Sequence, residues 1–539
     1  MKLMDEMSVD KLRGGYYTPA FLVHACFGRI ARLIAPRRDI RILEPSAGDG
    51  AFVRNLPAGL PFKKSGIRFT CVELVEEEAA KCQQSLDGAG LDGVVEATSF
   101  FDWACKSDAV FDAVVGNPPF VRYQFVDKMV RSDAESVLAS LGQTCDGVAN
   151  LWIPFVLVSL SRIRLGGAFA LVLPAELFSI KSAGQIRHFL LREFDGLTAD
   201  LYPRDSFPEI LQDVIVLSGR RASESDHRVV TIVDHSSGNG RSWQHDIPAS
   251  RLSWTRLLLT SEEREALALL TARQDWLPLG RVATLGVSIV TGANGYFTVN
   301  KALLDQHDLG HWARPLLAKT ADCPGLIYEQ ADHKRTIKAG RRAFLLDFAP
   351  EKADPRSMPL PAQYIALGEK QKLHTRFKCR IRNPWYRVPG IVNGTLMLTK
   401  RSHQHHRLLI NKAGVFTTDT VYRGDMKPGY LGRLADLVGG FHNSATLLSA
   451  EIEGRNYGGG VLELVPSEIQ RLLVPMLPAG KRLSELDKVC RANGGQLDKD
   501  DQLVAATNKV LLSVTPELQE ILRLLEAARQ RLRLWRFKR

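Results

Sequence analysis

Short apolar runs alternate with longer helix-like segments through the first 220 residues of the chain. This alternation is typical of a mostly parallel α/β sheet, in which a helix connects each strand to the next. The strands that the pattern predicts are residues 40–43, 68–72, 113–115, 168–173 and 213–218. Segment 151–160, LWIPFVLVSL, is apolar but too short to span a membrane, and it predicts a buried helix.

The pattern changes in the second half of the chain. Residues 219–255 are polar and predict a linker region with short strands in it. From about residue 275, Gly, Thr and basic residues become more frequent, and strand-length runs are separated by irregular loops. Residues 516–539 place Leu518, Leu522 and Leu525 on one helical face and end in a basic run. This stretch predicts a packing helix with a solvated basic end.

Length and charge divide the chain further. With 539 residues it exceeds one ordinary domain, and 45% hydrophobic residues exclude a largely disordered chain. The net charge is 71 − 59 = +12, but its distribution is uneven. Residues 1–250 hold 27 basic and 31 acidic residues, whereas residues 251–539 hold 44 and 28. The C-terminal half, at +16, is therefore expected to face a polyanion.

Cysteine and histidine usage argues against a metal site. The eight cysteines form no Cys-x-x-Cys pair, and none lies at zinc-ligand spacing from His403, His405 and His406. The N-terminus lacks a signal-peptide core, and no apolar run reaches about 18 residues. We therefore expect a cytoplasmic protein with no metal and no membrane anchor.

Asn117, Pro118, Pro119 and Phe120 directly follow the predicted strand at residues 113–115. The exocyclic amine of adenine is a poor nucleophile, because its lone pair is delocalised into the ring. The Asn117 side-chain oxygen and the Pro118 carbonyl can accept both amine hydrogens and so draw the nitrogen toward sp³ geometry. Phe120 offers a flat face on which an extruded base can stack. Alone, these four residues predict a turn with a buried aromatic equally well, so their context decides.

That context is a glycine-containing turn about 70 residues upstream. Residues 43–52, LEPSAGDGAF, follow a predicted strand, and Gly48 and Gly50 allow a tight turn with close backbone approach to a ligand. Glu73 ends the next strand, where a carboxylate can accept both ribose hydroxyls, although taken by itself it is better explained as a solvated charge beside residues 76–78. A third motif, GYYTP at residues 15–19, precedes a predicted helix.

The order YYTP, EPSAGDGAF, an acidic residue and NPPF resembles the gamma-type (TaqI-like) DNA adenine-N6 methyltransferases. The resemblance covers residues 14–220 and, more loosely, residues 270–480. It implies a class I S-adenosylmethionine-dependent methyltransferase fold, Rossmann-like with a mostly parallel seven-stranded sheet, and a C-terminal mixed α+β target recognition domain. The expected division is a catalytic domain at 1–255, a target recognition domain at 256–480 and a C-terminal helical segment at 481–539.

The resemblance also implies roles for individual residues. Those expected to line the methionine end of S-adenosylmethionine are Tyr17, Thr18 and Pro19. The loop around its methionyl part would comprise Glu44, Ser46, Ala47, Gly48 and Gly50. Glu73 would hold the ribose. Asn117 and Pro118 would accept the hydrogens of the target amine, and Phe120 would stack on the base. Phe207 matches a second aromatic that sandwiches the flipped adenine in this family, and a core phenylalanine remains the alternative.

One position departs from the family pattern. Family members usually place an Asp before a Phe after the third strand, where it contacts the cofactor adenine. This chain has Ser99 before Phe100, with Asp102 two residues further on. Either Ser99 replaces the carboxylate or Asp102 supplies it from a shifted register, and Phe100 is expected to stack on the cofactor adenine.

The densest basic segment runs over residues 370–407, with no acidic residue between Glu369 and Asp419. Interleaved aromatics and the lack of acidic residues favour contact with double-stranded DNA over an ordinary solvated face. The expected DNA-binding residues are Arg376, Lys378, Arg380, Arg382, Arg387, Lys400 and Arg401. A separate cognate restriction endonuclease is a further expected partner, because only about 15 residues precede the YYTP motif and leave no room for a fused nuclease domain.

Most alternative functions share this fold and differ in the molecule that accepts the methyl group. A methyltransferase acting on cytosine N4 or on RNA remains an alternative, although cytosine-N4 enzymes more often carry Ser where this chain has Asn117. A protein-glutamine methyltransferase would not need the basic second half. A non-catalytic DNA-specificity subunit has no physical need for an acceptor loop beside a methyl donor.

Overall fold

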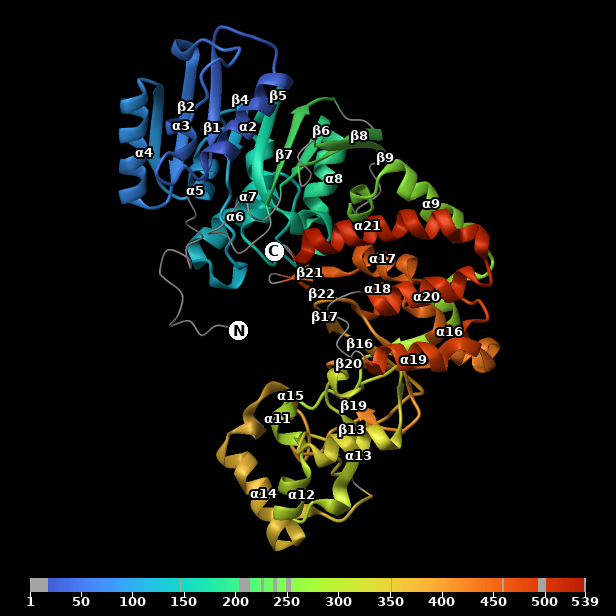
Figure 1. Ribbon diagram of the computed structural model, residues 1–539. Coiled ribbons are helices and arrows are strands. Elements are labelled where there is room, and N and C mark those ends of the chain that lie inside the picture. The colour runs from blue at the N-terminus through green and yellow to red at the C-terminus, as the bar shows by residue number, and fades with distance from the viewer. Residues whose placement is uncertain are drawn as a thin grey trace. The chain divides into compact units, whose positions relative to one another are not determined.

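The computed structural model describes residues 18–145, 147–202, 214–223, 227–235, 240–248, 254–349, 351–457, 460–492 and 501–537 (Figure 1). The described residues form two compact units, one ending at Ser261 and the other running from Glu262 to Phe537. Tyr17 and Phe207 lie outside the described residues. The unit boundary lies six residues beyond the predicted end of the catalytic domain, and the activity of each unit stays a prediction.

The first unit is built on one sheet, whose described strands have the order β3-β2-β1-β4-β5-β7-β6-β8-β9. β7 runs antiparallel to β5 and β6, and β9 antiparallel to β8, whereas the remaining pairs are parallel. The strands are β1 (Ile40–Glu44), β2 (Ile67–Glu73), β3 (Asp92–Ala97), β4 (Phe111–Gly116), β5 (Ile163–Pro174), β6 (Phe194–Leu201), β7 (Val214–Arg221), β8 (His227–Asp234) and β9 (Arg241–Pro248). The doubly wound class I fold is thus confirmed, and β8 and β9 extend its seven strands to nine.

The polar stretch predicted as a linker contains this extension. β8 pairs in parallel with β6, and β9 pairs along the whole length of β8. Val230 and Ile232 of β8 are buried, while β9 buries Trp243 and Ile247. A half-buried antiparallel pair needs only alternate apolar residues, which is why its sequence is polar enough to suggest a linker.

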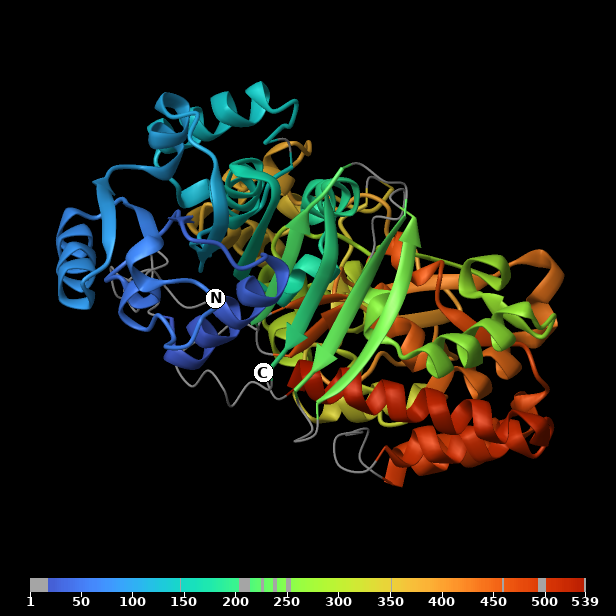
Figure 2. The ribbon, with the colours of Figure 1, turned by 90° about the horizontal axis from the view of Figure 1, so that it is seen from above.

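Helices cover both faces of this sheet (Figure 2). One contacting series packs along one face, and a second covers the other. The first series is α2 (Ala20–Leu33), α3 (Ala51–Arg54) and α4 (Glu76–Ala89); the second is α5 (Phe100–Lys106), α6 (Lys128–Ser140), α7 (Trp152–Ser161) and α8 (Gly184–Glu193). Nine of the ten residues of α7 are buried, which confirms the helix predicted from its apolar run.

The second unit combines small sheets with helices, as expected for a mixed α+β domain. Its described strands make sheets of order β11-β20-β16-β18-β14, β12-β15-β13-β19, β17-β22-β21 and β10-β23. These strands are β10 (Trp276–Pro278), β11 (Ala283–Gly286), β12 (Thr298–Val299), β13 (Ala313–Leu317), β14 (Ile327–Tyr328), β15 (Phe344–Leu346), β16 (Leu396–Thr399), β17 (Arg401–Ser402), β18 (Leu408–Asn411), β19 (Phe416–Thr417), β20 (Val421–Met426), β21 (Arg455–Tyr457), β22 (Val461–Glu463) and β23 (Leu473–Pro475).

The helices of this unit divide into a set along residues 261–380 and a C-terminal set. The first comprises α9 (Ser261–Ala272), α10 (Leu279–Val282), α11 (Asn294–Phe297), α12 (Lys301–Gln306), α13 (Gln330–Lys338), α14 (Pro359–Lys370) and α15 (Phe377–Arg380). The second comprises α16 (Leu434–Phe441), α17 (Ser444–Glu453), α18 (Pro466–Ile469), α19 (Leu483–Ala492), α20 (Gln502–Leu512) and α21 (Gln519–Phe537). α21 packs on α17, so the predicted C-terminal helical segment belongs to the same compact unit.

The basic end of α21 differs from its prediction. Leu518, Leu522 and Leu525 are buried as expected. However, Arg529 and Arg536 are 1% and 0% exposed, and both guanidinium groups form ion pairs. Arg536 pairs with the buried Glu451 of α17, whereas Arg529 pairs with Glu526 on α21 itself. The expectation of a solvated basic end is therefore wrong at Arg536, and Lys538 and Arg539 lie outside the described residues.

Candidate functional site

The loop after β1 forms a tight turn against the neighbouring strand. The backbone N–H of Ala47 donates to Val72 O at 3.0 Å, and that of Gly50 donates to Ala47 O at 3.0 Å. Gly48 and Gly50 have φ of +54° and +80°, in the left-handed region that favours glycine. At Gly50 a Cβ would also lie 2.9 Å from Ser85 Cβ, so the turn can close on α4 only with glycine there.

Glu73 joins this turn to the end of β2. Its carboxylate accepts hydrogen bonds from the backbone N–H of Gly48 at 2.8 Å and of Val75 at 2.9 Å. A carboxylate has about four acceptor positions, so two remain for the hydroxyls of a ribose. A Cβ placed on Gly48 would meet no atom within 4 Å, so the space in front of the turn is open. The free acceptor positions of Glu73 and the open space fit a nucleoside ligand.

Glu44 lies beneath this loop at the end of β1. The residue is 1% exposed, and the Cys71 thiol donates to its Oε2 at 3.9 Å. Burial, followed by the nearby Cys82, raises the pKa of its carboxyl group well above the usual value. Ser46 is partly exposed, whereas Ala47 is buried. Glu44 is therefore buried at the start of the loop, whereas Ser46 and Gly48 are partly exposed, and the expected role of Glu44 at the cofactor stays a prediction.

The predicted acceptor loop follows β4, the fully buried strand beside β1. Ser46 Oγ donates to the backbone carbonyl of Asn117 at 3.1 Å, and a Cβ on Gly116 would lie 3.4 Å from Pro45 Cδ. The two loops expected to hold methyl donor and acceptor are therefore in direct contact. This agrees with the rule that ligands bind at the carboxyl ends of parallel strands.

The side-chain oxygen of Asn117 is an unusual feature of this loop. Asn117 Oδ1 is buried and accepts no hydrogen bond from the described residues. An unsatisfied buried acceptor costs about 1–3 kcal/mol, so its retention calls for an explanation such as a ligand that donates to it. A group with N–H donors, such as an exocyclic amine, would satisfy this oxygen.

Phe120 and the prolines shape the rest of the loop. Pro118 is buried, while Phe120 is half-buried and packs against the main core of the first unit. The backbone N–H of Leu151 donates to Val121 O at 2.8 Å, which ties the exit of the loop to the start of α7. The phenyl ring is thus held in place and retains accessible surface.

Thr18 and Pro19 begin the described chain. Thr18 is 8% exposed, and Pro19 precedes α2, where its carbonyl accepts the N–H of Leu22 at 3.0 Å. Their predicted contact with the methionine end of a cofactor stays a prediction, as do the roles of Tyr17 and Phe207.

The three candidate residues in the segment after β3 have different surroundings. Phe100 is 3% exposed and packs against Phe101, Trp103 and Phe155, the last at a centroid distance of 4.6 Å. Asp102 accepts hydrogen bonds from Lys106 Nζ at 2.8 Å and Thr98 Oγ1 at 3.0 Å, and these bonds lower its pKa. Ser99 caps α5 in extended conformation and makes no side-chain cap bond. Ser99 has the freer side chain, because Asp102 is engaged by Lys106 on its own helix and by Thr98, which precedes that helix.

Sequence reasoning did not single out two features at this edge of the sheet. Leu74, next to Glu73, is 63% exposed, so an apolar surface adjoins the carboxylate. At the end of β6, Tyr202 stacks on His235 at 4.7 Å and meets Phe21 edge-on at 5.9 Å. The position of Leu74 after a strand-ending acid was a usable sequence signal, whereas the Tyr202 contacts join segments distant in sequence.

The expected DNA-binding residues fall into two groups. Arg376, Lys378 and Arg380 are exposed and pair with no carboxylate among the described residues. Arg382 instead donates to the carbonyls of Thr291 and Val290, both at 2.8 Å.

Lys400 and Arg401 share Glu463, at 3.8 and 2.7 Å, and Arg387 is half-buried close to Asp354. The first group thus differs from the others by having no carboxylate partner among the described residues, although Arg401 is also exposed.

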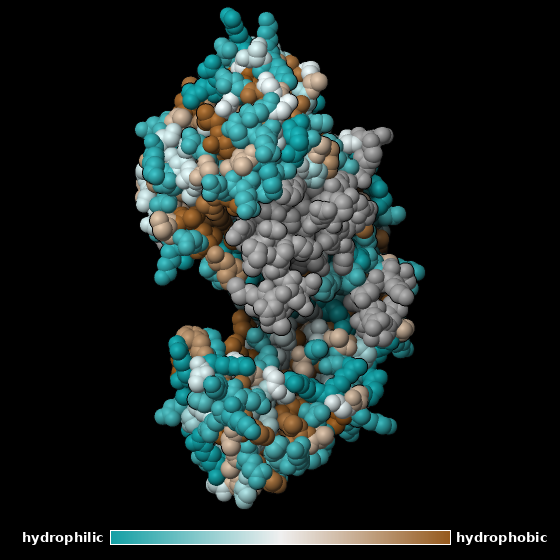
Figure 3. Space-filling view, turned by 90° about the vertical axis from the view of Figure 1, so that its left-hand side faces the viewer, coloured by the Kyte–Doolittle hydropathy of each residue, from teal (hydrophilic) through white to brown (hydrophobic). Residues whose placement is uncertain are grey.

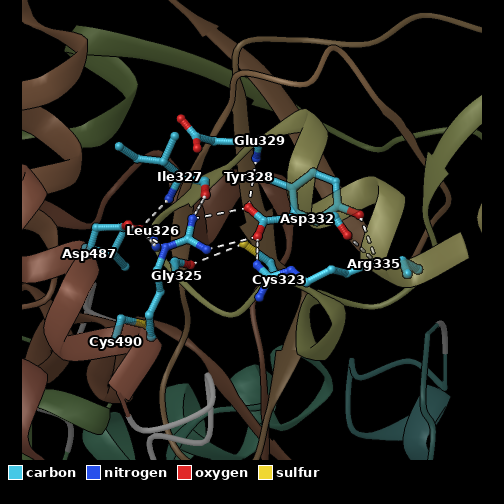
Figure 4. A network of polar contacts seen from close by, with 12 residues as sticks. Cys323, Gly325, Leu326, Ile327, Tyr328, Glu329, Asp332, Arg335, Asp487 and Cys490 are labelled. Carbon is cyan, nitrogen blue, oxygen red and sulfur yellow. Dashed lines mark hydrogen bonds and ion pairs between the residues drawn. The ribbon is translucent and has the colours of Figure 1, made fainter. Parts of the chain in front are cut away.

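Arg407, in the same basic segment, has a purely structural position. It is 6% exposed and donates to the carbonyls of Cys323 at 3.0 Å and Gly325 at 2.6 Å, and to Cys490 Sγ at 3.4 Å. Figure 4 shows Asp487 and Cys490 facing the chain from Cys323 to Glu329. This network of hydrogen bonds joins α19 to β14 and the residues before it. Arg407 therefore serves a structural contact and does not face DNA.

The histidine run at residues 403–406 is buried at His405 and His406, whereas His403 is exposed. His405 is 5% exposed and His406 0%, and burial lowers the pKa of His406 to about 4. His406 Nδ1 lies 2.7 Å from the carbonyl of Thr399. Among the described residues, no group of three or more His, Cys, Asp or Glu is arranged to hold a metal ion. None of the described helices is long and apolar enough to cross a membrane.

Comparison with known families gives matches over both units. The family model of the Eco57I restriction-modification methylase matches residues 64–196. The family model of the C-terminal domain of type II methyltransferase M.Eco57I matches residues 251–512. The first matched segment lies in the first unit, and the second begins just before the unit boundary and lies otherwise in the second unit.

Curated relatives match most or part of the chain at low sequence identity. Type II methyltransferase M.XamI of Xanthomonas campestris pv. amaranthicola is 22% identical over 474 residues, covering 86% of this chain and 85% of that protein. Type II methyltransferase M.AccI of Acinetobacter calcoaceticus is 19% identical over 481 residues, covering 85% and 84%. Type II methyltransferase M.TthHB8I of Thermus thermophilus is 28% identical over 214 residues, covering 39% and 46%.

Two solved structures share the fold over most of the chain. The type IIL restriction-modification enzyme MmeI in complex with DNA gives a TM-score of 0.53 at 12% identity, covering 98% of this chain and 77% of that one. The DrdV–DNA complex gives a TM-score of 0.51 at 12% identity, covering 89% and 57%.

Proposed function

We propose that this chain, a member of the type II DNA methyltransferases, methylates the N6 amine of adenine in duplex DNA at a specific sequence. The observation that carries the adenine assignment is the buried, unpartnered Oδ1 of Asn117 beside Pro118. The neighbouring turn at Gly48, with Glu73 behind it, is the proposed binding place of S-adenosylmethionine. Type II methyltransferase relatives over nearly the whole chain support DNA as the substrate.

S-adenosylmethionine, when bound, supplies an electrophilic methyl group to the reaction. The two free acceptor positions of Glu73 would take the ribose hydroxyls, and the exposed Leu74 would cover one face of the cofactor adenine. Thr18 and Pro19 would line the methionine end, with Ser46 and Gly48 around it.

Asn117 and Pro118 act on the acceptor. Asn117 Oδ1 and the Pro118 carbonyl each accept one hydrogen of the target amine, so the nitrogen becomes pyramidal and its lone pair points away from the two acceptors. The contact of Ser46 with the Asn117 carbonyl keeps the loop in register with the donor side. Positioning of this kind contributes more than acid–base chemistry here, because the amine loses its proton only after it has become cationic.

The base must leave the duplex to reach this loop, at a cost of a few kcal/mol. Stacking on Phe120, and on Phe207 in the proposed sandwich, stabilises the extruded base by roughly 1–3 kcal/mol. The second unit would hold the DNA through the exposed Arg376, Lys378 and Arg380. A separate restriction endonuclease that cleaves the same unmethylated sequence is the proposed cellular partner.

The test is transfer of labelled methyl groups from S-adenosylmethionine to duplex DNA, followed by modification-sensitive sequencing. We expect N6-methyladenine at one sequence motif. Detection of N4-methylcytosine would instead identify cytosine as the methylated base. Methylation of RNA or protein but not of DNA would overturn the proposal. Asn117→Ala should abolish transfer while cofactor binding measured by calorimetry persists. Gln244→Ala removes an exposed amide on the edge strand β9 and should remain fully active.

A further inference from the structure

Two large apolar side chains are exposed within the basic segment of the second unit. Phe377 is 61% exposed and Ile381 is 66% exposed. They lie four residues apart across α15 and its C-cap, so they share one side of this helical turn. Figure 3 shows a mostly hydrophilic molecular face on which hydrophobic residues form small groups. Two large apolar side chains exposed on the same side of one turn form a candidate contact surface.

The turn that carries them is firmly anchored. Cys379 is 0% exposed, and it and Leu373 belong to the hydrophobic core of this unit. Arg382 fastens the far end by donating to the carbonyls of Val290 and Thr291, both at 2.8 Å. Gly292 permits the close approach, since a Cβ there would lie 2.8 Å from Lys378 Cβ. The two apolar side chains therefore stand on a rigid base.

Positively charged side chains surround Phe377 and Ile381. Arg376, Lys378 and Arg380 are exposed, and no described carboxylate pairs with them. Lys378 Nζ and the Arg380 guanidinium lie 5.5 and 5.4 Å from the Phe377 ring centroid. A protein-docking surface would ordinarily be depleted in charge at its centre. An aromatic flanked by cations fits a ligand that offers both phosphates and stacked bases.

We propose that Phe377, supported by Ile381, inserts as a wedge between adjacent base pairs of the bound DNA, while Arg376, Lys378 and Arg380 hold the flanking phosphates. Apolar side chains that enter the base stack in this way unstack one step and bend the duplex. This inference rests on the proposed function, because it needs duplex DNA as the ligand. It assigns the second unit a deforming role in addition to phosphate contact.

The test compares Phe377→Ala with Leu269→Ala on the duplex that carries the methylated motif. Leu269 is a matched control, because it is 60% exposed in the same unit but lies on α9 beside Glu262 and Glu265. Loss of stacking should raise the dissociation constant of Phe377→Ala roughly 5- to 100-fold. The salt dependence of binding should stay the same, because no phosphate contact is lost, whereas Arg380→Gln should reduce the slope by about 0.9.

A 2-aminopurine probe placed at successive steps of the duplex reports the unstacking directly. Wild-type protein and Phe377→Trp should raise its fluorescence at one step, and Phe377→Ala should not. The wedge is refuted if Phe377→Ala binds and unstacks DNA like the control, or if it loses only a protein partner. Wild-type protein that methylates no DNA would instead overturn the proposed function itself.

Discussion

The buried guanidinium of Arg536 provides the sharpest stability prediction. Arg536 donates to both carboxylate oxygens of Glu451 at 2.9 and 2.7 Å, and to the carbonyls of His403 and Gln404 at 2.6 and 2.9 Å. It also contacts the Gly460 carbonyl. The Arg536 and Glu451 side chains are 0% and 5% exposed. Arg536→Met therefore leaves a carboxylate buried without its charged partner.

The size of the effect follows from this burial. Breaking a buried ion pair by removing one partner costs about 3–5 kcal/mol, because the remaining charge is left uncompensated. With a urea dependence of about 3 kcal/mol per molar, the unfolding midpoint should fall by roughly 1–1.7 M. The double variant Arg536→Met/Glu451→Met removes both charges and should recover much of this loss, although the released carbonyls keep recovery incomplete.

Urea unfolding of the full chain, followed by circular dichroism, measures these differences. Arg523→Met is the matched control on the same helix, because its ion pair with Glu520 has 65% and 66% exposed partners. Exposed pairs contribute about 0.2–1 kcal/mol, so its midpoint should barely move. If Arg536→Met unfolds at the same urea concentration as Arg523→Met, the assignment of α21 as a charge-paired core helix is wrong.

Two further predictions concern pH and the cofactor site. Burial lowers the pKa of His406 to about 4 and of His442 to about 3, so between pH 6.5 and these values the unfolded chain binds more protons. The free energy of unfolding should fall by about 1.4 kcal/mol per histidine per pH unit from pH 6.5 toward 5, and a flat urea midpoint over this range would contradict it. Glu73→Gln should weaken S-adenosylmethionine binding roughly 10- to 100-fold in calorimetry. Glu76→Gln, an exposed neighbour, should not, and equal affinities would remove Glu73 from the site.

The pattern of hydrophobic residues predicted the central strands of the first sheet well. It missed strands whose sequences lack a continuous apolar run. β1, β2, β4, β5 and β7 were all predicted, because central strands are continuous apolar runs. β3 was missed because, as an edge strand, none of its residues is buried. β6 was missed because it contains the buried Asp200, whose charge is matched by Arg29 from α2 at 2.5 Å. Such a pairing over 171 positions leaves no local signal.

The candidate site shows a similar division. Motif order indicated that the Gly48 turn and the Asn117 loop belong together, and the structure brings them into contact. Charge counting was less informative, since it cannot separate exposed cations such as Arg380 from structural ones such as Arg407. That distinction depends on partners that the chain brings in from distant segments.

The contact between the Ser46 hydroxyl and the Asn117 carbonyl has a consequence for how catalysis begins. The two loops proposed to hold the methyl donor and the acceptor form a continuous scaffold, because a Cβ on Gly116 would also lie 3.4 Å from Pro45 Cδ. Little conformational search is then needed to align the two reactants once both are bound, and the entropy of alignment is lost during folding rather than in each catalytic cycle. Any substitution that separates the two loops should consequently slow turnover even when each substrate still binds with full strength.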